Sequence, residues 1–348
     1  MPKKRVAIVG LGKIGLFHLS LLKNFEEVEV VGLVDEKSSV QKTVGGMGVH
    51  APFFDDVEKM IASIRPDAVF ACVPPAFNLP VAEACVRNNV SVFVEKPMAQ
   101  GLEEAKKMAG LLNGRDPKPA NAVGYMVAYY PTFRHAREIL GQKLAGEIRH
   151  YSASLLLGEV FKKQEGWRQN PKISGGGAVA VLGSHLLYLI QSLFGLPSRV
   201  AGRTFKLFSD VEDLCQATLE HPGFSGEFNV SWSRPGFDEM TFQIHAEGTA
   251  GFIEITENCL SFYAFEGHPK FPPGWKVWYP WDFPKAAPPG KVQFSQQGYA
   301  SQDDDFIKSI GTGRELPVSW SQGLKVQRMI EGLYRSASSS GQMIHLPD

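Results

Sequence analysis

A glycine-rich turn near the start of the chain has the residue types and the spacing that bind a diphosphate. The turn, residues 10–15, reads Gly-Leu-Gly-Lys-Ile-Gly and follows a short apolar run at 5–9. An acidic residue, Asp35, stands 20 residues after the last glycine, at the end of a second apolar run at 28–34. Glycines at this spacing let a pyrophosphate approach the amino end of the following helix, while the acid accepts hydrogen bonds from ribose hydroxyls. The pattern predicts a dinucleotide site made by Gly10, Gly12, Lys13, Ile14, Gly15 and Asp35.

The carboxylate of Asp35 also bears on which dinucleotide is bound. A negative charge at this position repels the 2′-phosphate of NADP, so the sequence favours NAD. Lys37 and Ser38 follow closely and could offset part of that repulsion, so NADP stays an alternative.

The alternation of strand and helix patterns continues to about residue 125 and predicts a doubly wound parallel sheet. The expected strands are 68–73, 90–94 and 122–125, and the expected helices are 55–64, 79–88 and 102–112. In an open sheet of this kind the carboxyl ends of the strands form the ligand crevice. Two of these strand ends carry further candidate cofactor-binding residues, Val73 and Pro74 after one strand and Glu95 and Lys96 after another.

The pattern changes after a turn-rich connector at 113–121, which predicts a second domain. Strand patterns separated by turn signals predict a mostly antiparallel sheet there. The expected strands are 149–157, 199–206, 216–221, 226–233, 241–247 and 251–256, and the expected helices are 132–140, 178–194, 303–310 and 322–338. We therefore expect an α/β chain with a Rossmann domain over 1–123 and a second α/β domain, with a large open sheet, over 124–348.

Residues 263–299 differ from their surroundings in being rich in proline and aromatic residues. A long loop inside a compact domain is often functional. Trp275, Trp278, Tyr279 and Trp281 could stack on a sugar ring as a substrate lid, or they could pack on the sheet or on a partner subunit. Both interpretations are open from the sequence.

Composition limits the classes of partner. Lys+Arg and Asp+Glu each number 36, so the chain lacks the net basic charge that binds nucleic acid or anionic membranes. Its apolar runs are broken by glycine or charge before they reach membrane length, and no signal-peptide core is recognised. The four cysteines, Cys72, Cys85, Cys215 and Cys259, form no Cys-x-x-Cys pair, which predicts free thiols in a reducing cytoplasm and no metal site.

Motifs spread over nearly the whole chain resemble those of the glucose–fructose oxidoreductase / inositol dehydrogenase / MocA (Gfo/Idh/MocA) family. They are 10–15, Val73-Pro74-Pro75, Glu95-Lys96-Pro97-Met98-Ala99, Gly124-Tyr125, Trp167-Arg168, 174–177, Gly183, His185, Asp304-Asp305-Phe306-Ile307 and Leu316-Pro317-Val318. The resemblance implies an NAD(P)-dependent enzyme that oxidises or reduces one carbon of a sugar, cyclitol or nucleotide sugar. It also implies a homodimer or homotetramer, because an exposed sheet face in such a second domain commonly pairs with a copy of itself.

The resemblance assigns roles to particular residues. Lys96 matches the family's active-site lysine, whose bond to the following proline is often cis, and would stabilise negative charge on the reacting oxygen. His185 would take the hydroxyl proton, because an imidazole titrates near working pH. Tyr188, one helical turn away, would supply a hydroxyl to the same cavity or would only pack, and glycines 175–177 would let the backbone approach the ligands. The substrate-binding residues implied are Tyr125, Trp167, Arg168, Gly177 and His185.

Several positions depart from the family pattern. Val181 and Tyr188 stand where relatives often carry aspartates, and Met126 and Val127 stand where many carry asparagine and arginine. These changes keep two alternatives open: a dinucleotide-binding regulator without turnover, and a reductase of a non-sugar substrate such as an imine or a tetrapyrrole. The retained lysine and histidine favour an enzyme over a regulator.

Overall fold

The computed structural model describes residues 2–37, 39–161, 167–267, 271–284 and 297–346, arranged as two units. In their described residues, the first unit contains Met1–Met126 and Ala286–Leu324, and the second contains Val127–Lys285 and Lys325–Asp348. The chain therefore returns to the first unit after most of the second unit. The sequence predicted a single boundary at residue 123 and did not predict this return.

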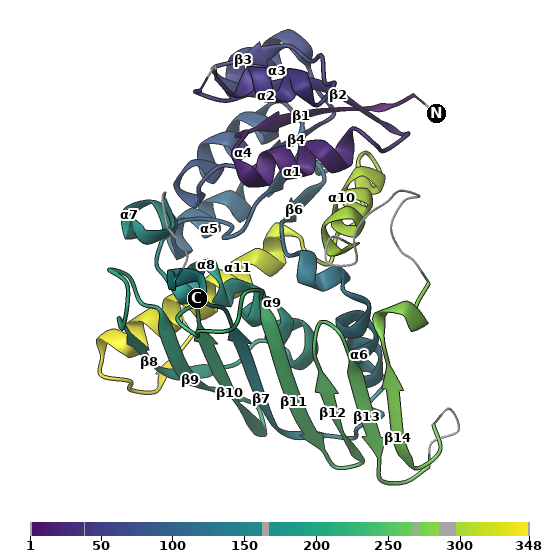
Figure 1. Cartoon of the computed structure of the whole chain (residues 1–348), viewed down its shortest axis with the longest axis vertical. Helices are drawn as coiled ribbons and strands as arrows, with labels where there is room; N and C mark the ends of the chain where they lie inside the picture. The colour runs from purple at the N-terminus through teal and green to yellow at the C-terminus, as the bar shows by residue number, and fades with distance from the viewer. Residues whose placement is uncertain (1, 38, 162–166, 268–270, 285–296, 347–348) are drawn as a thin grey trace. The chain divides into compact units, whose positions relative to one another are not determined.

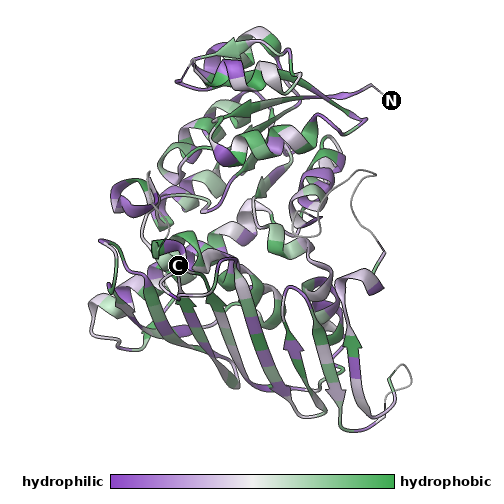
Figure 2. Cartoon of the chain, viewed as in Figure 1, coloured by the Kyte–Doolittle hydropathy of each residue, from purple (hydrophilic) through white to green (hydrophobic). Residues whose placement is uncertain are grey.

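The first unit is built on a parallel sheet with the strand order β3-β2-β1-β4-β5-β6 (Figure 1). Its strands are β1 (Lys4–Val9), β2 (Val28–Val34), β3 (Phe53–Phe54), β4 (Ala68–Ala71), β5 (Ser91–Val94) and β6 (Asn121–Val123). Every residue of β4 and β5 is buried, as expected of strands covered on both faces, and Figure 2 shows the strands of this sheet as largely hydrophobic. The strand order reverses beside β1, so the carboxyl ends of β1 and β4 flank the position where open parallel sheets bind ligands.

Helices connect these strands. They are α1 (Lys13–Leu22), α2 (Val40–Gly46), α3 (Val57–Ile64), α4 (Asn78–Arg87) and α5 (Leu102–Gly110), with the short 3-10 turn η1 (Pro75–Phe77). The helix α10 (Gln297–Ser309) belongs to the returning segment of this unit, and the 3-10 turn η2 (Met126–Tyr129) spans the boundary with the second unit. The sequence patterns miss α2 and β3, because elements this short contain too few residues to show a period. They also place the start of α10 too late, so Asp303 lies inside this helix, where its side chain is buried.

The second unit is built on a large sheet with the order β14-β13-β12-β11-β7-β10-β9-β8-β15. Its strands are β7 (Ile148–Leu156), β8 (Arg199–Phe205), β9 (Leu214–His221), β10 (Phe224–Ser231), β11 (Thr241–Gly248), β12 (Gly251–Ile255), β13 (Leu260–Ala264), β14 (Gly274–Trp278) and β15 (Ile344–His345). Among the pairs formed by described residues, β7 with β10 is parallel and the others are antiparallel. The predicted fold class, a Rossmann sheet followed by a mostly antiparallel sheet, is confirmed.

Helices cover one face of this second sheet. They are α6 (Pro131–Gly141), α8 (Ala178–Val181), α9 (Gly183–Phe194) and the part of α11 (Trp320–Ser338) that follows Leu324, whereas the four-residue helix α7 (Pro171–Ser174) packs on the turn at 167–169. α6 packs on β12 and β13, α8 on β9 and β10, and α9 on β7. Burial alternates along the strands, so that in β10 Phe228 and Val230 are buried while Glu227 is exposed on the opposite face. The alternation expected of a sheet covered on one face is therefore present.

The structure corrects two expectations for this unit. The region expected as one long loop at 263–299 contains β14, whose Trp275 packs against Tyr263 with ring centroids 5.3 Å apart. Trp278 packs against His135 of α6 at 4.7 Å, so these two tryptophans support packing on the unit's own elements rather than a lid. Parts of 263–299 lie outside the described residues.

The helix expected at 178–194 is interrupted at Leu182, between α8 and α9. Within the described part of the chain, no single helix has the length and apolar composition needed to cross a membrane. One pair of apolar helical segments, 171–181 and 183–194, reaches that length together but is bent by 50°.

Candidate active site

The glycine turn lies at the carboxyl end of β1, where two of its glycines are required by close contacts inside the protein. Gly10 has a φ of +86°, and a Cβ there would lie 2.6 Å from the carbonyl oxygen of Cys72 and 2.9 Å from Val73 Cγ1. A Cβ on Gly15 would overlap the carbonyl oxygen of Gly10. These contacts pack the turn tightly against the end of β4, which also brings Val73 and the adjacent Pro74 to the turn.

Gly12 differs from the other two glycines because nothing in the protein requires it to be small. It is exposed, and a Cβ at this position would meet no atom within 4 Å. Gly12 is also the N-cap of α1 and provides no side-chain cap, so the first N–H groups of this helix are available to an anion. An open position at an uncapped helix start fits the pyrophosphate of a dinucleotide, for which Lys13 and Ile14 follow as the first residues of α1.

Asp35 lies at the end of β2 with its carboxylate turned toward the glycine turn. Its Oδ2 accepts the N–H of Leu11 at 2.6 Å, and its Oδ1 accepts the N–H of Lys37 at 2.8 Å. A carboxylate has about four acceptor positions, so each oxygen keeps one for a ribose hydroxyl. The two backbone hydrogen bonds therefore hold the side chain in one orientation and leave acceptor positions suited to the hydroxyls of an adenosine ribose. Ser38 lies outside the described residues.

Lys96 follows β5 at the same rim of the sheet, and the backbone around it is held from two sides. The N–H of Lys96 is 3.2 Å from Oε2 of Glu95. The buried Asn78 side chain, at the start of α4, places Nδ2 3.1 Å from the carbonyl oxygens of Glu95 and Pro97 and 3.3 Å from that of Met98. The Lys96–Pro97 peptide is cis, as the resemblance implies.

Glu95 points inward from this segment. Its Oε1 lies 3.1 Å from Nε2 of His18 on α1, and a Cβ on Gly124 would lie 2.6 Å from the same oxygen. Nδ1 of His18 is in turn 2.8 Å from Oδ2 of Asp303 on α10. The carboxylate of Glu95 is thus part of a buried network, which supports the seating of the Lys96 segment more than direct contact with a cofactor.

The second unit holds the glycines 175–177 by a second buried carboxylate. Oε1 of Glu212 accepts the N–H of Gly177 at 2.8 Å, the N–H of Val179 at 3.2 Å and the hydroxyl of Tyr334 at 2.6 Å. A Cβ on Gly177 would overlap the backbone of Glu212, and one on Gly176 would overlap the Tyr334 hydroxyl. Internal packing therefore explains two of these glycines, which we expected to be small for the sake of a ligand.

His185 and Tyr188 lie on α9, the helix that follows this turn. Both side chains are buried, each with 1% of its surface exposed. Burial raises the pKa of Tyr188 to about 12, although the nearby Arg137 and a hydrogen bond with Ser192 lower it. Tyr188 is therefore a neutral phenol at working pH and can act as a hydrogen-bond partner but not as a base.

The remaining predicted substrate-binding residues occupy different environments. Tyr125 follows β6 in the first unit and is fully buried. Trp167 and Arg168 lie on the 3-10 turn η4 (Trp167–Gln169), which packs on α7. The Arg168 side chain is 51% exposed and pairs with Glu159 at 2.7 Å, so its charge is already engaged on the surface of the second unit.

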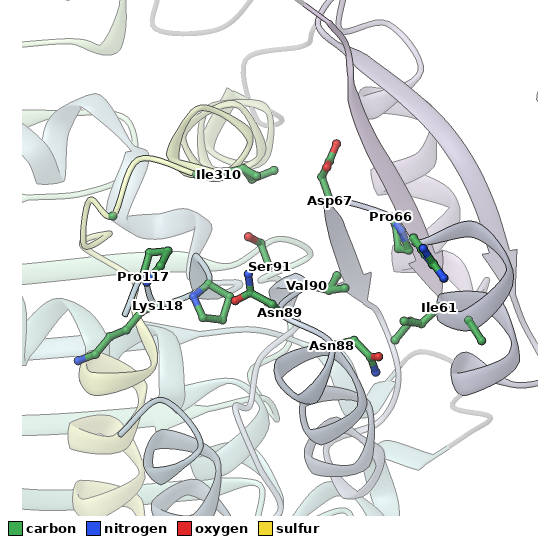
Figure 3. Close-up of a pocket in the computed structure, with 15 residues that line it drawn as sticks. Ile61, Pro66, Asp67, Asn88, Asn89, Val90, Ser91, Pro117, Lys118 and Ile310 are labelled. Atoms are coloured by element: carbon green, nitrogen blue, oxygen red, sulfur yellow. The ribbon is translucent and has the colours of Figure 1, made fainter. Parts of the chain in front are cut away.

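One open cavity of the first unit lies away from all of these residues. It has a volume of about 650 Å³ and is lined by residues such as Asp67, Asn88, Ser91 and Lys118 (Figure 3). Asp67 and Ser91 stand at the amino ends of β4 and β5, whereas the glycine turn stands at a carboxyl end. The cavity therefore belongs to the opposite edge of the sheet. Among the described residues, no group of three or more His, Cys, Asp or Glu side chains is placed so that it could hold a metal ion.

Sequence reasoning missed the residues that support the candidate site, namely His18, Asn78, Asp303, Glu212 and Tyr334. For His18, the sequence did contain one signal. His18 stands in a helix whose neighbours Leu19, Leu21 and Leu22 are buried, and a polar side chain on such a face needs a partner. The identity of that partner could not be read from the sequence, because Asp303 is 285 residues away.

Two family descriptions match this chain, one in each unit. Residues 4–118 match the oxidoreductase family with an NAD-binding Rossmann fold, and residues 133–254 match the GFO/IDH/MocA C-terminal domain. The first match covers the glycine turn, Asp35 and Lys96, and the second covers Gly177, His185 and Tyr188. The NAD-binding assignment of the first unit, which the glycine turn predicted, is thereby confirmed.

Individual relatives and solved structures agree with this assignment. An uncharacterized oxidoreductase of Synechocystis is 23% identical over 56% of this chain and 52% of its own length, so the chain spans about half of that relative. A D-glucoside 3-dehydrogenase of Escherichia coli is 25% identical over 56% of this chain and 55% of its length. A levoglucosan dehydrogenase, solved in complex with NADH and levoglucosan, superposes with a TM-score of 0.86 at 18% identity and covers 99% of this chain and 100% of that chain. The chain belongs to the GFO/IDH/MocA family of NAD-binding oxidoreductases.

Proposed function

We propose that this protein is an NAD-dependent dehydrogenase that moves a hydride between the nicotinamide and one carbon of a sugar, cyclitol or nucleotide sugar. The observation that carries the proposal is the segment at Lys96, held by Glu95 and Asn78 at the same sheet rim as the glycine turn. Support for the substrate class comes from relatives, since the E. coli protein is a D-glucoside 3-dehydrogenase and the structural neighbour binds levoglucosan.

The preference for NAD over NADP rests on Asp35. Two backbone bonds hold its carboxylate beside the turn, where a 2′-phosphate would meet a fixed negative charge. Lys37 is engaged there through its backbone N–H, and its side chain is exposed. NADP therefore remains the second candidate cofactor.

In the proposed reaction the bound nicotinamide supplies the hydride acceptor or donor. Lys96 donates a hydrogen bond to the reacting oxygen and stabilises the negative charge that develops there. His185 takes the proton of the alcohol in oxidation and returns it in reduction. Tyr188 offers a neutral hydroxyl in place of the carboxylates common in relatives, and Tyr125, Trp167, Arg168 and Gly177 stay candidates for contacts with the substrate.

The test is a screen of glucosides, inositols, nucleotide sugars and simple ketones, followed through the absorbance of the reduced nicotinamide. With an active substrate in hand, Lys96→Ala and His185→Ala should each reduce kcat by about a hundredfold or more, as expected for loss of charge stabilisation or of acid–base catalysis. NADH binding, measured by fluorescence, should survive in both. Turnover close to that of the wild type in either variant would remove that residue from the mechanism. NADH binding without turnover on any substrate would favour the regulator, and turnover of ketones or imines alone would favour a non-sugar reductase.

Two further properties belong to the same proposal. The exposed polar face of the second sheet, with Gln216, Glu227 and Gln243, supports a homodimer or homotetramer, which light scattering would test against a monomeric mass. The free thiols of Cys72, Cys85 and Cys215 are buried, which supports a reducing, cytoplasmic location. We propose no nucleic acid or membrane as a partner.

A further inference from the structure

A histidine buried in the first unit lies between two carboxylates that come from distant parts of the chain. His18 has no exposed surface, and its Nδ1 and Nε2 lie 2.8 Å from Asp303 Oδ2 and 3.1 Å from Glu95 Oε1. The rings of Phe70 and Phe93 lie 5.5 and 5.3 Å from the imidazole. The imidazole is thus buried beside apolar rings, where an uncompensated charge is costly.

With both carboxyl groups ionised, the arrangement is satisfied by the imidazolium form, whereas a neutral ring would need one carboxyl group to be protonated. A neutral histidine has one ring N–H and can donate to one carboxylate, whereas the protonated ring donates to both. Burial lowers the pKa of His18, but the charges and hydrogen bonds of Asp303 and Glu95 outweigh it and raise the pKa to about 10. Burial also raises the pKa of Asp303, an effect that the charge and hydrogen bond of His18 oppose. Because both ring nitrogens face carboxyl oxygens, we assign the charged form, one cation between two carboxylates, to neutral pH.

The network continues to the backbone of the proposed catalytic lysine. While Oε1 of Glu95 faces His18, its Oε2 receives the N–H of Lys96 at 3.2 Å. His18 is also part of α1, the helix whose amino end carries Gly12. One buried cation thus links the helix that begins at the dinucleotide turn to the segment that carries Lys96.

We propose that His18 is a positioning residue for hydride transfer, and that it acts by holding the Glu95 carboxylate in the orientation that fixes the Lys96 backbone. This inference rests on the proposed function, in which Lys96 contacts the reacting oxygen. Reaction geometry is sensitive to displacements of about 1 Å, which can cost about a hundredfold in rate. His18 itself touches neither substrate nor cofactor in this scheme. Its effect on rate passes through the position of Lys96.

The most direct test does not depend on turnover. In His18→Gln the two carboxylates lose their shared cation, so the N–H of Lys96 should lose its fixed acceptor. Amide exchange measured by mass spectrometry on a peptide spanning 94–98 should become about tenfold faster. A peptide covering β4 (Ala68–Ala71), in the same sheet, serves as the internal reference.

A matched control separates positioning from general loss of stability. Phe306→Leu removes packing from the same core, where Phe306 lies 5.3 Å from Phe70 and 5.7 Å from Phe93. It leaves the three charged groups in place. We expect this variant to loosen both peptides together, with their ratio of exchange rates unchanged. If Phe306→Leu changes that ratio as much as His18→Gln does, the proposal is overturned.

A second variant tests the electrostatic part. His18→Gln leaves two buried carboxylates without a cation, and adding Asp303→Asn reduces the charge to one. The double variant His18→Gln/Asp303→Asn should therefore exchange more slowly at 94–98 than His18→Gln alone. If the effects of the two substitutions on the exchange rate at 94–98 instead add, the network acts by packing and the proposal is wrong.

Kinetics with any substrate found in the screen complete the test. His18→Gln should lower kcat by about ten- to a hundredfold, while KM and the Kd for NADH change by less than about threefold. Unchanged kcat together with faster exchange at 94–98 would overturn the proposal while leaving the proposed function intact. Failure of the wild type to turn over any substrate would count against the proposed function alone, because the exchange ratios still decide whether His18 fixes Lys96.

Discussion

Two buried glutamates support the segments that carry the proposed catalytic residues, and they are satisfied in different ways. Glu95 of the first unit uses both of its oxygens, one toward the His18 imidazolium and the other toward the N–H of Lys96. It shares a cation enclosed in the core with Asp303. Because the two oxygens have different partners, the carboxylate is fixed in rotation as well as in position.

The side chain of Glu212, in the second unit, receives all of its described hydrogen bonds on a single oxygen. Oε1 accepts the N–H groups of Gly177 and Val179 and the hydroxyl of Tyr334. Gly177 is the N-cap of the short helix α8, so the carboxylate also faces the positive end of a helix. No cation is among its described partners.

The comparison separates two ways of keeping a carboxylate in a protein interior. A cation between two carboxylates resists rearrangement but depends on its proton, whereas N–H and hydroxyl donors tolerate changes of pH. We therefore expect the segment at Lys96 to be the more pH-sensitive of the two. The turn at 175–177 depends more on close packing against Glu212 and Tyr334.

The largest expected difference in the free energy of unfolding is between the two isosteric substitutions Glu95→Gln and Glu212→Gln. A glutamine at 95 must present its amide NH₂ to one of two donors, so the first variant should lose about 3 kcal/mol in the free energy of unfolding. A glutamine at 212 can keep its carbonyl oxygen toward all three donors and should lose about 1 kcal/mol or less. Urea unfolding of both variants measures the difference. Equal losses would show that both carboxylates are held in the same manner.

The difference between these networks also shows what the sequence could predict. The glycine turn, Asp35 and Lys96 each lie at the end of an apolar run, so local patterns and the geometry of a parallel sheet were sufficient to bring them to one rim. His18 and Asp303 could not be paired in this way, because they meet only after the chain has formed the second unit and returned. Asp303 even stands in an acidic run, Asp303-Asp304-Asp305, that is typical of an exposed helix face.

The elements of the second unit that the sequence did not predict were missed for a different physical reason. β14 lies in a region whose proline content obscured the period of two, so Trp275 and Trp278 looked like loop residues. The break at Leu182 divides an apolar run that continues through it, and composition does not reveal the change of direction. Glu212 precedes a strand and carries no local signal of the turn that it binds.

The pH dependence of stability should distinguish the two networks further. The folded-state pKa of His18 is raised to about 10 from an ordinary value of 6.5, so its contribution is fully present below pH 6.5 and is lost as the pH rises through about 10. Between pH 7 and 9 the free energy of unfolding should fall by about 2 kcal/mol, since one bound proton corresponds to about 1.4 kcal/mol per pH unit. Urea unfolding at a series of pH values measures this slope.

His18→Gln is the control for this slope, because other groups also titrate over the same interval. The groups that face His18 are Asp303, whose pKa burial raises, Glu95 and Tyr299. The Cys72 thiol interacts with the two carboxylates, and burial raises its pKa well above the ordinary value. We therefore expect the difference between the wild type and His18→Gln to shrink as the pH rises from 6.5 to 10. A difference independent of pH would mean that His18 is neutral in the folded protein.

The smallest expected effect of pH is on the second network, and Tyr334→Phe measures it. Tyr334→Phe removes the hydroxyl that lies 2.6 Å from Glu212 Oε1, but the N–H groups of Gly177 and Val179 still satisfy that oxygen. The free energy of unfolding should fall by about 1 kcal/mol, the usual net contribution of one hydrogen bond. The loss should be the same at pH 7 and pH 9, because burial and the nearby Glu212 raise the pKa of Tyr334 well above its ordinary value and the phenol does not ionise in this range. A loss as large as that of Glu95→Gln, or one that changes over this interval, would show that the turn at 175–177 is held by a charge-dependent network like that of the first unit.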